Sequence, residues 1–241
     1  MDLMAITGNG MQHDLQRMVT ISQNMANVLT PGYKKQIVSG PAFAALVQSS
    51  LPSPAAASLA DTAATLSIDP AAGALRHTGN LHDVAIEGSG FFEVESRTGP
   101  QYTRQGGLRA DVNGRLVGAH DLPLAGTTGD ITLTPEPFTV DTNGDVRQGE
   151  RIAGRLKLVH FDNPEALVPV GGGLYQQGSA HLAGREISSR VRAGFQETSN
   201  VNSAQEMVRL TETVRHFESL QKIMQGYDDV LEKTIRKLGE F

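Results

Sequence analysis

Apolar side chains recur in steps of three and four residues over the C-terminal part of the chain. This spacing lines up one seam of an amphipathic helix that packs in the manner of a coiled coil. The seam consists of Leu210, Val214, Phe217, Gln221, Met224, Asp228, Leu231, Ile235 and Leu238. A second stripe beside it consists of Leu220, Ile223, Tyr227 and Val230. Two adjacent seams suit a helix packed among several neighbours, or one broad stripe buried within its own fold.

A second helix with the same spacing is predicted near the N-terminus. Its seam consists of Met11, Leu15, Met18, Ser22 and Met25. It ends at residues 30–32 (Thr-Pro-Gly), because proline disfavours helical backbone in the residue before it and glycine permits a turn. The C-terminal helix begins at an S-x-x-E capping box, Ser203 to Glu206. Two such helices at opposite ends of a chain are most simply paired antiparallel, with the middle as a separate module.

The middle of the chain carries the patterns of β-structure. Residues 83–87, 91–95 and 154–161 are rich in β-formers, and two Asp-x-Asn-Gly sequences begin at Asp111 and Asp141, where hairpins are expected. Prolines at 123, 135, 137, 164 and 169 exclude long helices there and restrict strands to sheet edges.

The predicted fold is α+β, with paired N- and C-terminal helices forming a coiled-coil stem and a central all-β module. The expected boundaries are 1–35 for the first helix, 36–80 for an extended or linker segment, 81–198 for the β-module and 199–241 for the last helix. The linker prediction rests on the small, uncharged residues at 51–58.

Composition narrows the function. The net charge of -5 is mild and no basic run is present, so nucleic acid and anionic membrane surfaces are not expected partners. No segment has the roughly 20 apolar residues of a membrane span, which predicts no direct membrane insertion. The start of the sequence lacks the pattern of a cleavable signal peptide, so any export is expected to proceed without cleavage. The absence of cysteine excludes disulfide and thiolate chemistry.

The candidate chemical motifs each favour a structural interpretation. The sequence Asp-x-Asn-Gly at residue 141 lacks the further ligands of a calcium loop. The sequence Gly-Ser-Gly at residues 88–90 is not followed by a helix, as a phosphate-binding loop requires. The seven histidines form no ligand pair on either helix. We therefore predict no catalytic, cofactor-binding or metal-binding residue, and no enzyme.

Three blocks of sequence resemble the bacterial flagellar rod and hook family. Residues 21–34 (ISQNMANVLTPGYK) are similar to its N-terminal motif, an Asn-Leu-Ala-Asn core followed by Thr-x-Gly-aromatic-Lys. Residues 78–92 and 102–106 (YTRQG) resemble the second block, and residues 199–202 (SNVN) with 206–208 resemble the third. His82 departs from the pattern, because the family usually has an apolar residue there.

This resemblance implies a structural subunit of the flagellar basal body. The proximal-rod branch is the most similar, with the distal-rod branch as the alternative. The family fold implies a tubular helical assembly around an export channel, with homo-oligomer contacts, other rod proteins and the flagellar type III export apparatus as partners. The expected location is the periplasm-spanning rod, which transmits motor torque. A different class, a secreted β-module on an oligomerising helical stalk, remains an alternative.

The resemblance also assigns packing roles to the two helices. Leu210, Val214, Phe217, Met224 and Leu231 are expected to face Leu15, Met18 and Met25 within the subunit. Leu220, Ile223 and Tyr227 are expected to face neighbouring subunits. Asn24 and Asn27 are expected to hold the end of the first helix through hydrogen bonds to backbone groups.

Overall fold

The computed structural model describes residues 3–39, 65–184 and 189–238, which fall into two compact units. The helical unit takes residues 1–25, 37–66 and 203–241, and the β-module takes residues 26–36 and 67–202. The predicted α+β class is confirmed. The residues on which the linker prediction rests, 51–58, lie outside the described ranges.

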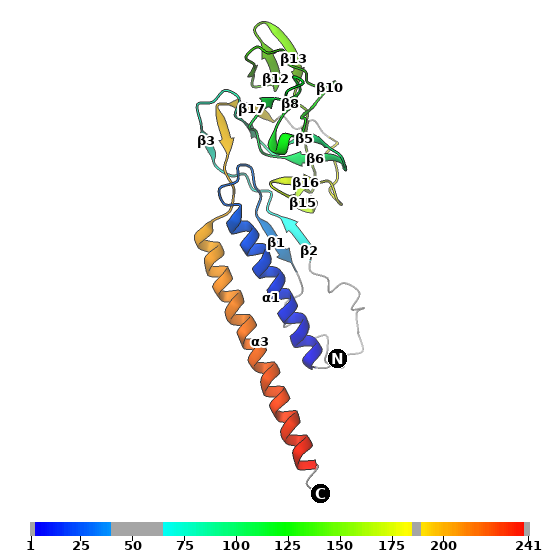
Figure 1. The fold of residues 1–241 in the computed structure, drawn as a ribbon, viewed down its shortest axis with the longest axis vertical. Helices are drawn as coiled ribbons and strands as arrows, with labels where there is room; N and C mark the ends of the chain where they lie inside the picture. The colour runs from blue at the N-terminus through cyan, green and yellow to red at the C-terminus, as the bar shows by residue number, and fades with distance from the viewer. Residues whose placement is uncertain (1–2, 40–64, 185–188, 239–241) are drawn as a thin grey trace. The chain divides into compact units, whose positions relative to one another are not determined.

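The helical unit contains two long helices, α1 (Leu3–Ala26) and α3 (Ser203–Leu238). Figure 1 shows them side by side and antiparallel. Helix α3 begins at the predicted Ser203. It has Glu206 in its first turn and two basic residues in its last turn, and these charges interact favourably with the helix dipole. The antiparallel pairing that the sequence predicted is present.

The β-module is built from short strands. In chain order these are β3 (Leu75–His77), β4 (Val84–Glu87), β5 (Phe91–Ser96), β6 (Gly99–Thr103), β7 (Arg109–Ala110), β8 (Leu116–Val117), β9 (Ala125–Gly126), β10 (Gly129–Asp130), β11 (Thr139–Val140), β12 (Asp145–Gln148), β13 (Arg151–Arg155), β14 (Leu158–Val159), β15 (Val168–Gly171), β16 (Leu174–Gln176), β17 (Arg190–Ala193) and β18 (Phe195–Glu197). Two 3-10 turns, η1 (Ala119–Asp121) and η2 (Pro164–Ala166), interrupt them. Two further strands, β1 (Gln36–Ser39) and β2 (Thr65–Ile68), pair with each other.

The largest sheet has five strands in the order β14-β5-β6-β16-β15, all antiparallel. A three-stranded sheet has the order β11-β12-β13, and β17 pairs with β4 while β18 pairs with β3. Pro169 lies in β15, at the edge of the large sheet. This position agrees with the expectation that proline, which lacks an amide donor, is restricted to edges.

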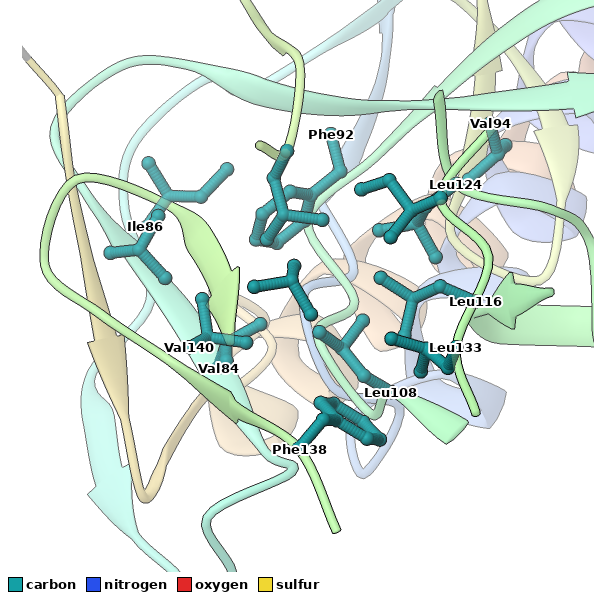
Figure 2. Packing of buried hydrophobic residues seen from close by; sticks show 14 of the residues in the cluster. Val84, Ile86, Phe92, Val94, Leu108, Leu116, Leu124, Leu133, Phe138 and Val140 are labelled. Atoms are coloured by element: carbon teal, nitrogen blue, oxygen red, sulfur yellow. The ribbon is translucent and has the colours of Figure 1, made fainter. Parts of the chain in front are cut away.

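The larger of two apolar clusters in the β-module is shown in Figure 2. It joins side chains from strands far apart in the sequence, among them Val84, Phe92, Leu116 and Val146, which are all at most 1% exposed. Burial of this kind contributes roughly 25 cal/mol per Å² of apolar surface. The β-module therefore has a core of its own.

The two Asp-x-Asn-Gly sequences form hairpins of the same geometry. In the first, the Asp111 carboxylate accepts hydrogen bonds from the amides of Asn113 and Arg115, both at 2.8 Å. In the second, the Asp141 carboxylate accepts from the amides of Asn143 at 2.8 Å and Asp145 at 3.1 Å. Gly114 and Gly144 have φ angles of 78° and 81°, a left-handed backbone conformation that glycine adopts more readily than other residues. Strand pairs β7–β8 and β11–β12 flank them, as predicted.

Candidate functional site

The interior of the helix pair is a single line of side chains on α3. Its members are fully or half buried, whereas every other described side chain between residues 203 and 237 is exposed. They follow steps of four and three residues, the period of a coiled-coil seam. The line consists of Glu206, Leu210, Thr213, Phe217, Leu220, Met224 and Tyr227.

This line corrects the predicted division of the helix faces. Val214 and Leu231 were expected inside, but they are 36% and 41% exposed. Leu220 was expected to face outward, but it is 2% exposed, and Tyr227 is half buried. The predicted seam included Gln221 and Asp228, which are exposed, and it missed two buried polar residues, Glu206 and Thr213. Ile223, expected to face outward, is 46% exposed.

The buried face of α1 is likewise more polar than predicted. Leu15 was expected inside and is 49% exposed, while Met18 and Met25 are half buried. The polar residues buried on α1 are Thr7, Asp14, Thr20 and Asn24, and the apolar residues Ile6 and Ile21 are also buried. The predicted seam therefore lies about one residue away from the real one.

Two polar contacts fix how α1 and α3 align. Asn24 Nδ2 donates a hydrogen bond to Glu206 Oε2 at 3.2 Å, and both side chains are buried. Asp14 Oδ2 lies 2.6 Å from His216 Nδ1. The contact residues are ten apart on each helix and run in opposite directions, so the two contacts share one antiparallel register. Polar pairs of this kind typically select a register and exclude others.

The same register leaves the end of α3 without α1 beside it. The first residue of α1, Leu3, falls level with Tyr227, the last member of the buried line. Residues 228–237 beyond it are all exposed. This stretch, which we call the α3 overhang, includes Val230, Leu231 and Ile235 at 61%, 41% and 68% exposure.

The predicted asparagines occupy two different settings. Asn24 hydrogen-bonds to the Glu206 carboxylate, as described above. Asn27 is half buried in the turn after α1, where its Oδ1 accepts a hydrogen bond from the Thr30 hydroxyl at 3.1 Å and its backbone oxygen accepts from the Thr30 amide at 3.1 Å. These contacts are to side chains as well as backbone. That their role is to hold the helix end stays a prediction.

A buried cluster of charges lies within the β-module. Glu197, at the end of β18, contacts Lys34 Nζ through Oε1 at 2.6 Å and Arg104 Nη1 through Oε2 at 3.1 Å. All three side chains are at most 2% exposed. A buried ion pair offsets its desolvation only when further hydrogen bonds satisfy the remaining polar atoms. We call these residues the Glu197 cluster.

Backbone groups satisfy further polar atoms of the Glu197 cluster, whereas Arg104 Nε is buried and has no hydrogen-bond partner among the described residues. The amide of Gly73 donates to Glu197 Oε1 at 2.9 Å, Lys34 Nζ donates to the Ala71 carbonyl at 2.7 Å, and Arg104 Nη2 donates to the Gly88 carbonyl at 2.6 Å. Burial lowers the pKa of Lys34 and of Arg104, and the Glu197 carboxylate opposes both shifts. The cluster therefore ties together the segments in which these residues lie.

Tyr175 borders the cluster and fixes the backbone of Lys34. Its hydroxyl oxygen accepts a hydrogen bond from the Lys34 amide at 2.8 Å. The side chain is 1% exposed, and burial raises the pKa of its hydroxyl. Gly32, two residues earlier, has a φ of 63°, and a Cβ there would lie 2.5 Å from the Arg104 carbonyl carbon. Only glycine fits this approach.

The Glu197 cluster joins the three sequence blocks noted above. Lys34 ends the Thr-Pro-Gly-Tyr-Lys motif, Arg104 lies in Tyr-Thr-Arg-Gln-Gly, and Glu197 comes two residues before Ser-Asn-Val-Asn. Sequence reasoning identified the blocks but did not predict their convergence. No local pattern signals this convergence, because the three charged residues lie in segments far apart in the chain.

His82 departs from the usual apolar residue without losing its packing. Its ring is stacked on Phe138, with centroids 4.3 Å apart and planes at 10°. An imidazole in this geometry covers a phenyl face much as an apolar side chain does. The departure is therefore compatible with the same local fold.

Among the described residues, no group of three histidine or acidic side chains is placed to hold a metal ion. Within those same ranges, neither helix combines the length and the apolar character needed to cross a membrane.

Two family models match this chain. Residues 192–237 match the C-terminal region of flagellar basal body rod proteins FlgE, FlgF and FlgG, and residues 85–148 match the D1 domain of the flagellar hook proteins FlgE, FlgF and FlgG. The first match covers most of α3, and the second covers much of the β-module. Together they define a structural protein of the flagellar rod or hook type.

Individual similar proteins indicate which group of this family the chain resembles. The flagellar basal-body rod protein FlgF of Caulobacter vibrioides is 32% identical over 70% of both chains. FlgG of Buchnera aphidicola subsp. Baizongia pistaciae is 30% identical over 95% of this chain and 96% of its own, and FlgG of Bacillus subtilis is 27% identical over 94% and 95%. The chain belongs to the flagellar basal-body rod protein family, in the group of FlgF and FlgG.

Proposed function

We propose that this chain is a subunit of the proximal part of the flagellar rod, where copies of it and other rod proteins pack through their helices into a tube that transmits torque. The observation that carries the proposal is the distribution of polarity in the helical unit. Among the helical residues whose burial the structure describes, six polar residues are buried beside three large apolar ones, Ile6, Ile21 and Leu220. The surface of the helical unit exposes a large share of its apolar side chains.

The exposed apolar residues suit contacts with neighbouring subunits. On α1 they include Leu15 and Val19, at 49% and 57% exposure, and on α3 they include Val214, Ile223 and the α3 overhang. A helix that packed only against its own subunit would place these apolar residues on its buried face. Clustered apolar exposure marks an interaction surface, and burial on assembly would stabilise the helices by mass action.

A substitution in the α3 overhang tests this proposal. Leu231→Asp places a charge on the exposed apolar surface, so we expect folded, monomeric protein with an unchanged circular dichroism spectrum. Cells carrying this variant are expected to lose motility and to lack the protein in purified basal bodies. Gln225→Asp, which adds the same charge at an exposed polar position of α3, serves as the matched control. Normal incorporation of Leu231→Asp would contradict the proposal.

The branch within the family is part of the proposal. The relative at 32% identity is a FlgF, which supports the proximal position. The distal rod is the second candidate, because FlgG relatives align over 94% and 95% of this chain. Gold labelling of an epitope-tagged copy in isolated basal bodies distinguishes them: label in the half of the rod nearer the cytoplasmic membrane supports the first, and label in the far half supports the second.

The route to this location completes the proposal. We expect export through the flagellar type III apparatus without cleavage of the N-terminus, followed by assembly in the periplasm. Support comes from α1, whose Asp14 and Asn24 contact α3, so that removal of this part of the chain would remove both contacts. Mass spectrometry of the protein in purified basal bodies tests this, because removal of the N-terminal residues would contradict it.

A further inference from the structure

The two Asp-x-Asn-Gly hairpins differ in what covers their tips. In both, the glycine carbonyl accepts a hydrogen bond from a later strand: Gly114 from the Leu133 amide at 2.6 Å and Gly144 from the Leu156 amide at 2.9 Å. The tip of the second hairpin has an additional partner. The Thr142 carbonyl accepts a hydrogen bond from the Val191 amide at 3.1 Å.

This partner is the free edge of strand β17. Val191 pairs with β4 on its other side, through Ile86, and its own side chain is fully buried. The docked sequence is Arg190-Val191-Arg192, a β-branched residue between two basic ones. It meets a hairpin that carries Asp141, and beneath it Gly144 and Asp145 are buried. The second hairpin therefore docks, through the Thr142 carbonyl, on a strand edge in which a β-branched residue lies between two basic ones.

The first hairpin lacks this cover. Val112, at the position equivalent to Thr142, is 101% exposed. Among the residues that the structure describes, none donates a hydrogen bond to its carbonyl oxygen. Arg115, equivalent to the buried Asp145, is exposed. The same turn geometry therefore presents an apolar tip with a free acceptor.

We propose that the tip of the first hairpin, Asp111 to Arg115, docks on a strand edge of a second copy of this chain, in the way the second hairpin docks on β17. This inference rests on the proposed assembly into a rod. The edge with matching chemistry is the start of β13, where Arg151 precedes the β-branched Ile152. Ile152 is 51% exposed, and β13 is the outer strand of the sheet β11-β12-β13.

Such a contact has the right symmetry for a rod. It uses two different patches, a hairpin tip on one copy and a strand edge on the next, so it is a heterologous contact that propagates rather than closing a dimer. A strand edge carries unpaired backbone groups that accept an added partner. The fully exposed Val112 would become buried on docking, and removal of its apolar surface from water would favour the contact.

Val112→Asp tests the surface. Because Val112 is fully exposed, the variant is expected to fold with an unchanged melting temperature, while its incorporation into basal bodies falls at least tenfold. Leu182→Asp, at another apolar position with 53% exposure, is the matched control and should incorporate normally. Normal incorporation of Val112→Asp would overturn the inference. If Leu231→Asp is still excluded in the same assay, the proposed function stands without it.

Crosslinking tests the occupant. The chain has no cysteine, so Val112→Cys combined with Ile152→Cys introduces the only thiols. Oxidised basal bodies should yield a ladder of disulfide-linked copies, because the bond requires Cβ atoms about 4 Å apart. Each single variant should yield monomer. No ladder, a dimer from Val112→Cys alone, or a ladder only when Val112→Cys is paired with Val168→Cys in β15 would each overturn the assignment.

Discussion

The helical unit and the β-module distribute polarity in opposite ways. The β-module surrounds an apolar cluster, and side chains such as Val84 and Phe92 have no exposed surface. The helical unit buries polar contacts between α1 and α3 and exposes residues such as Val19 and Ile235. The difference teaches that the β-module stabilises itself through its own apolar core, whereas much of the apolar surface of the helical unit lies outside the packing of α1 against α3.

Charge shows the same contrast. The Glu197 cluster is enclosed within the β-module, where backbone groups of Ala71 and Gly73 add hydrogen bonds to it. In the helical unit, the Asp14 carboxylate is 3% exposed, but its partner His216 is 48% exposed. Removing a charge from the Glu197 cluster should therefore cost more than removing a polar contact between the helices, and the predictions below run from the largest expected effect to the smallest.

The largest effect is expected from Glu197→Gln. The substitution leaves Lys34 and Arg104 buried without a counter-charge, and breaking a buried ion pair from one side costs about 3–5 kcal/mol. The loss in the free energy of unfolding is measured by urea unfolding, with tyrosine fluorescence as the signal. Glu93→Gln is the matched control, since Glu93 pairs with the half-exposed Lys157 and should lose about 1 kcal/mol or less. Equal losses in the two variants would show that the cluster is not special.

The sequence predicted local features better than convergent ones. The Asp111 and Asp141 hairpins were predictable because their hydrogen bonds join residues at most four positions apart. The helices were predictable from their period. The seam was misplaced because Glu206 and Thr213 are buried, and a search for apolar positions passes over them. The Glu197 cluster could not be predicted, because it joins segments far apart in the chain through contacts that no local period encodes.

An effect of similar size is expected from Phe92→Ala. Phe92 lies in the apolar cluster with no exposed surface, so its truncation creates a cavity and should cost about 3–5 kcal/mol. Leu15→Ala, at an exposed apolar position of α1, should change the free subunit by about 0.5 kcal/mol or less. Thermal unfolding of purified, unassembled protein measures both. A large loss from Leu15→Ala would break the comparison, because it would show that the helices bury this residue without neighbours.

A smaller effect is expected from the polar contact between Asn24 and Glu206. A hydrogen bond to a charged group contributes about 1.5–3 kcal/mol. A double-mutant cycle with Asn24→Ala and Glu206→Gln should give a coupling energy near the lower value. Unfolding of each variant is followed by the circular dichroism signal of the helices at 222 nm. Repeating the cycle with Met207, which is 56% exposed, in place of Glu206 should give no coupling. Absence of coupling for Asn24 and Glu206 would remove the argument that this contact sets the register.

The smallest effect is expected from Asp145→Asn, and it depends on pH. Hydrogen bonds from Arg155 hold the pKa of Asp145 below its usual value, although Arg155 is half exposed. A lowered folded-state pKa stabilises the fold above the unfolded value of about 3.9, and this stability is lost as pH falls through the folded value. The variant should be about 1 kcal/mol less stable at pH 7. In unfolding titrations the difference should vanish under strongly acidic conditions; a difference that persisted there would assign the loss to packing.

The Glu197 cluster also has a consequence in time. Lys34 and Glu197 are 163 positions apart, so the contact between them forms only after almost all of the β-module has been synthesised. Contacts of such long range make folding slow, and domains form from the N-terminus as the chain emerges. Until Glu197 has been synthesised, Lys34 and Arg104 lack the carboxylate with which they form ion pairs. Formation of the Glu197 cluster is therefore expected to be a late step in the folding of the β-module.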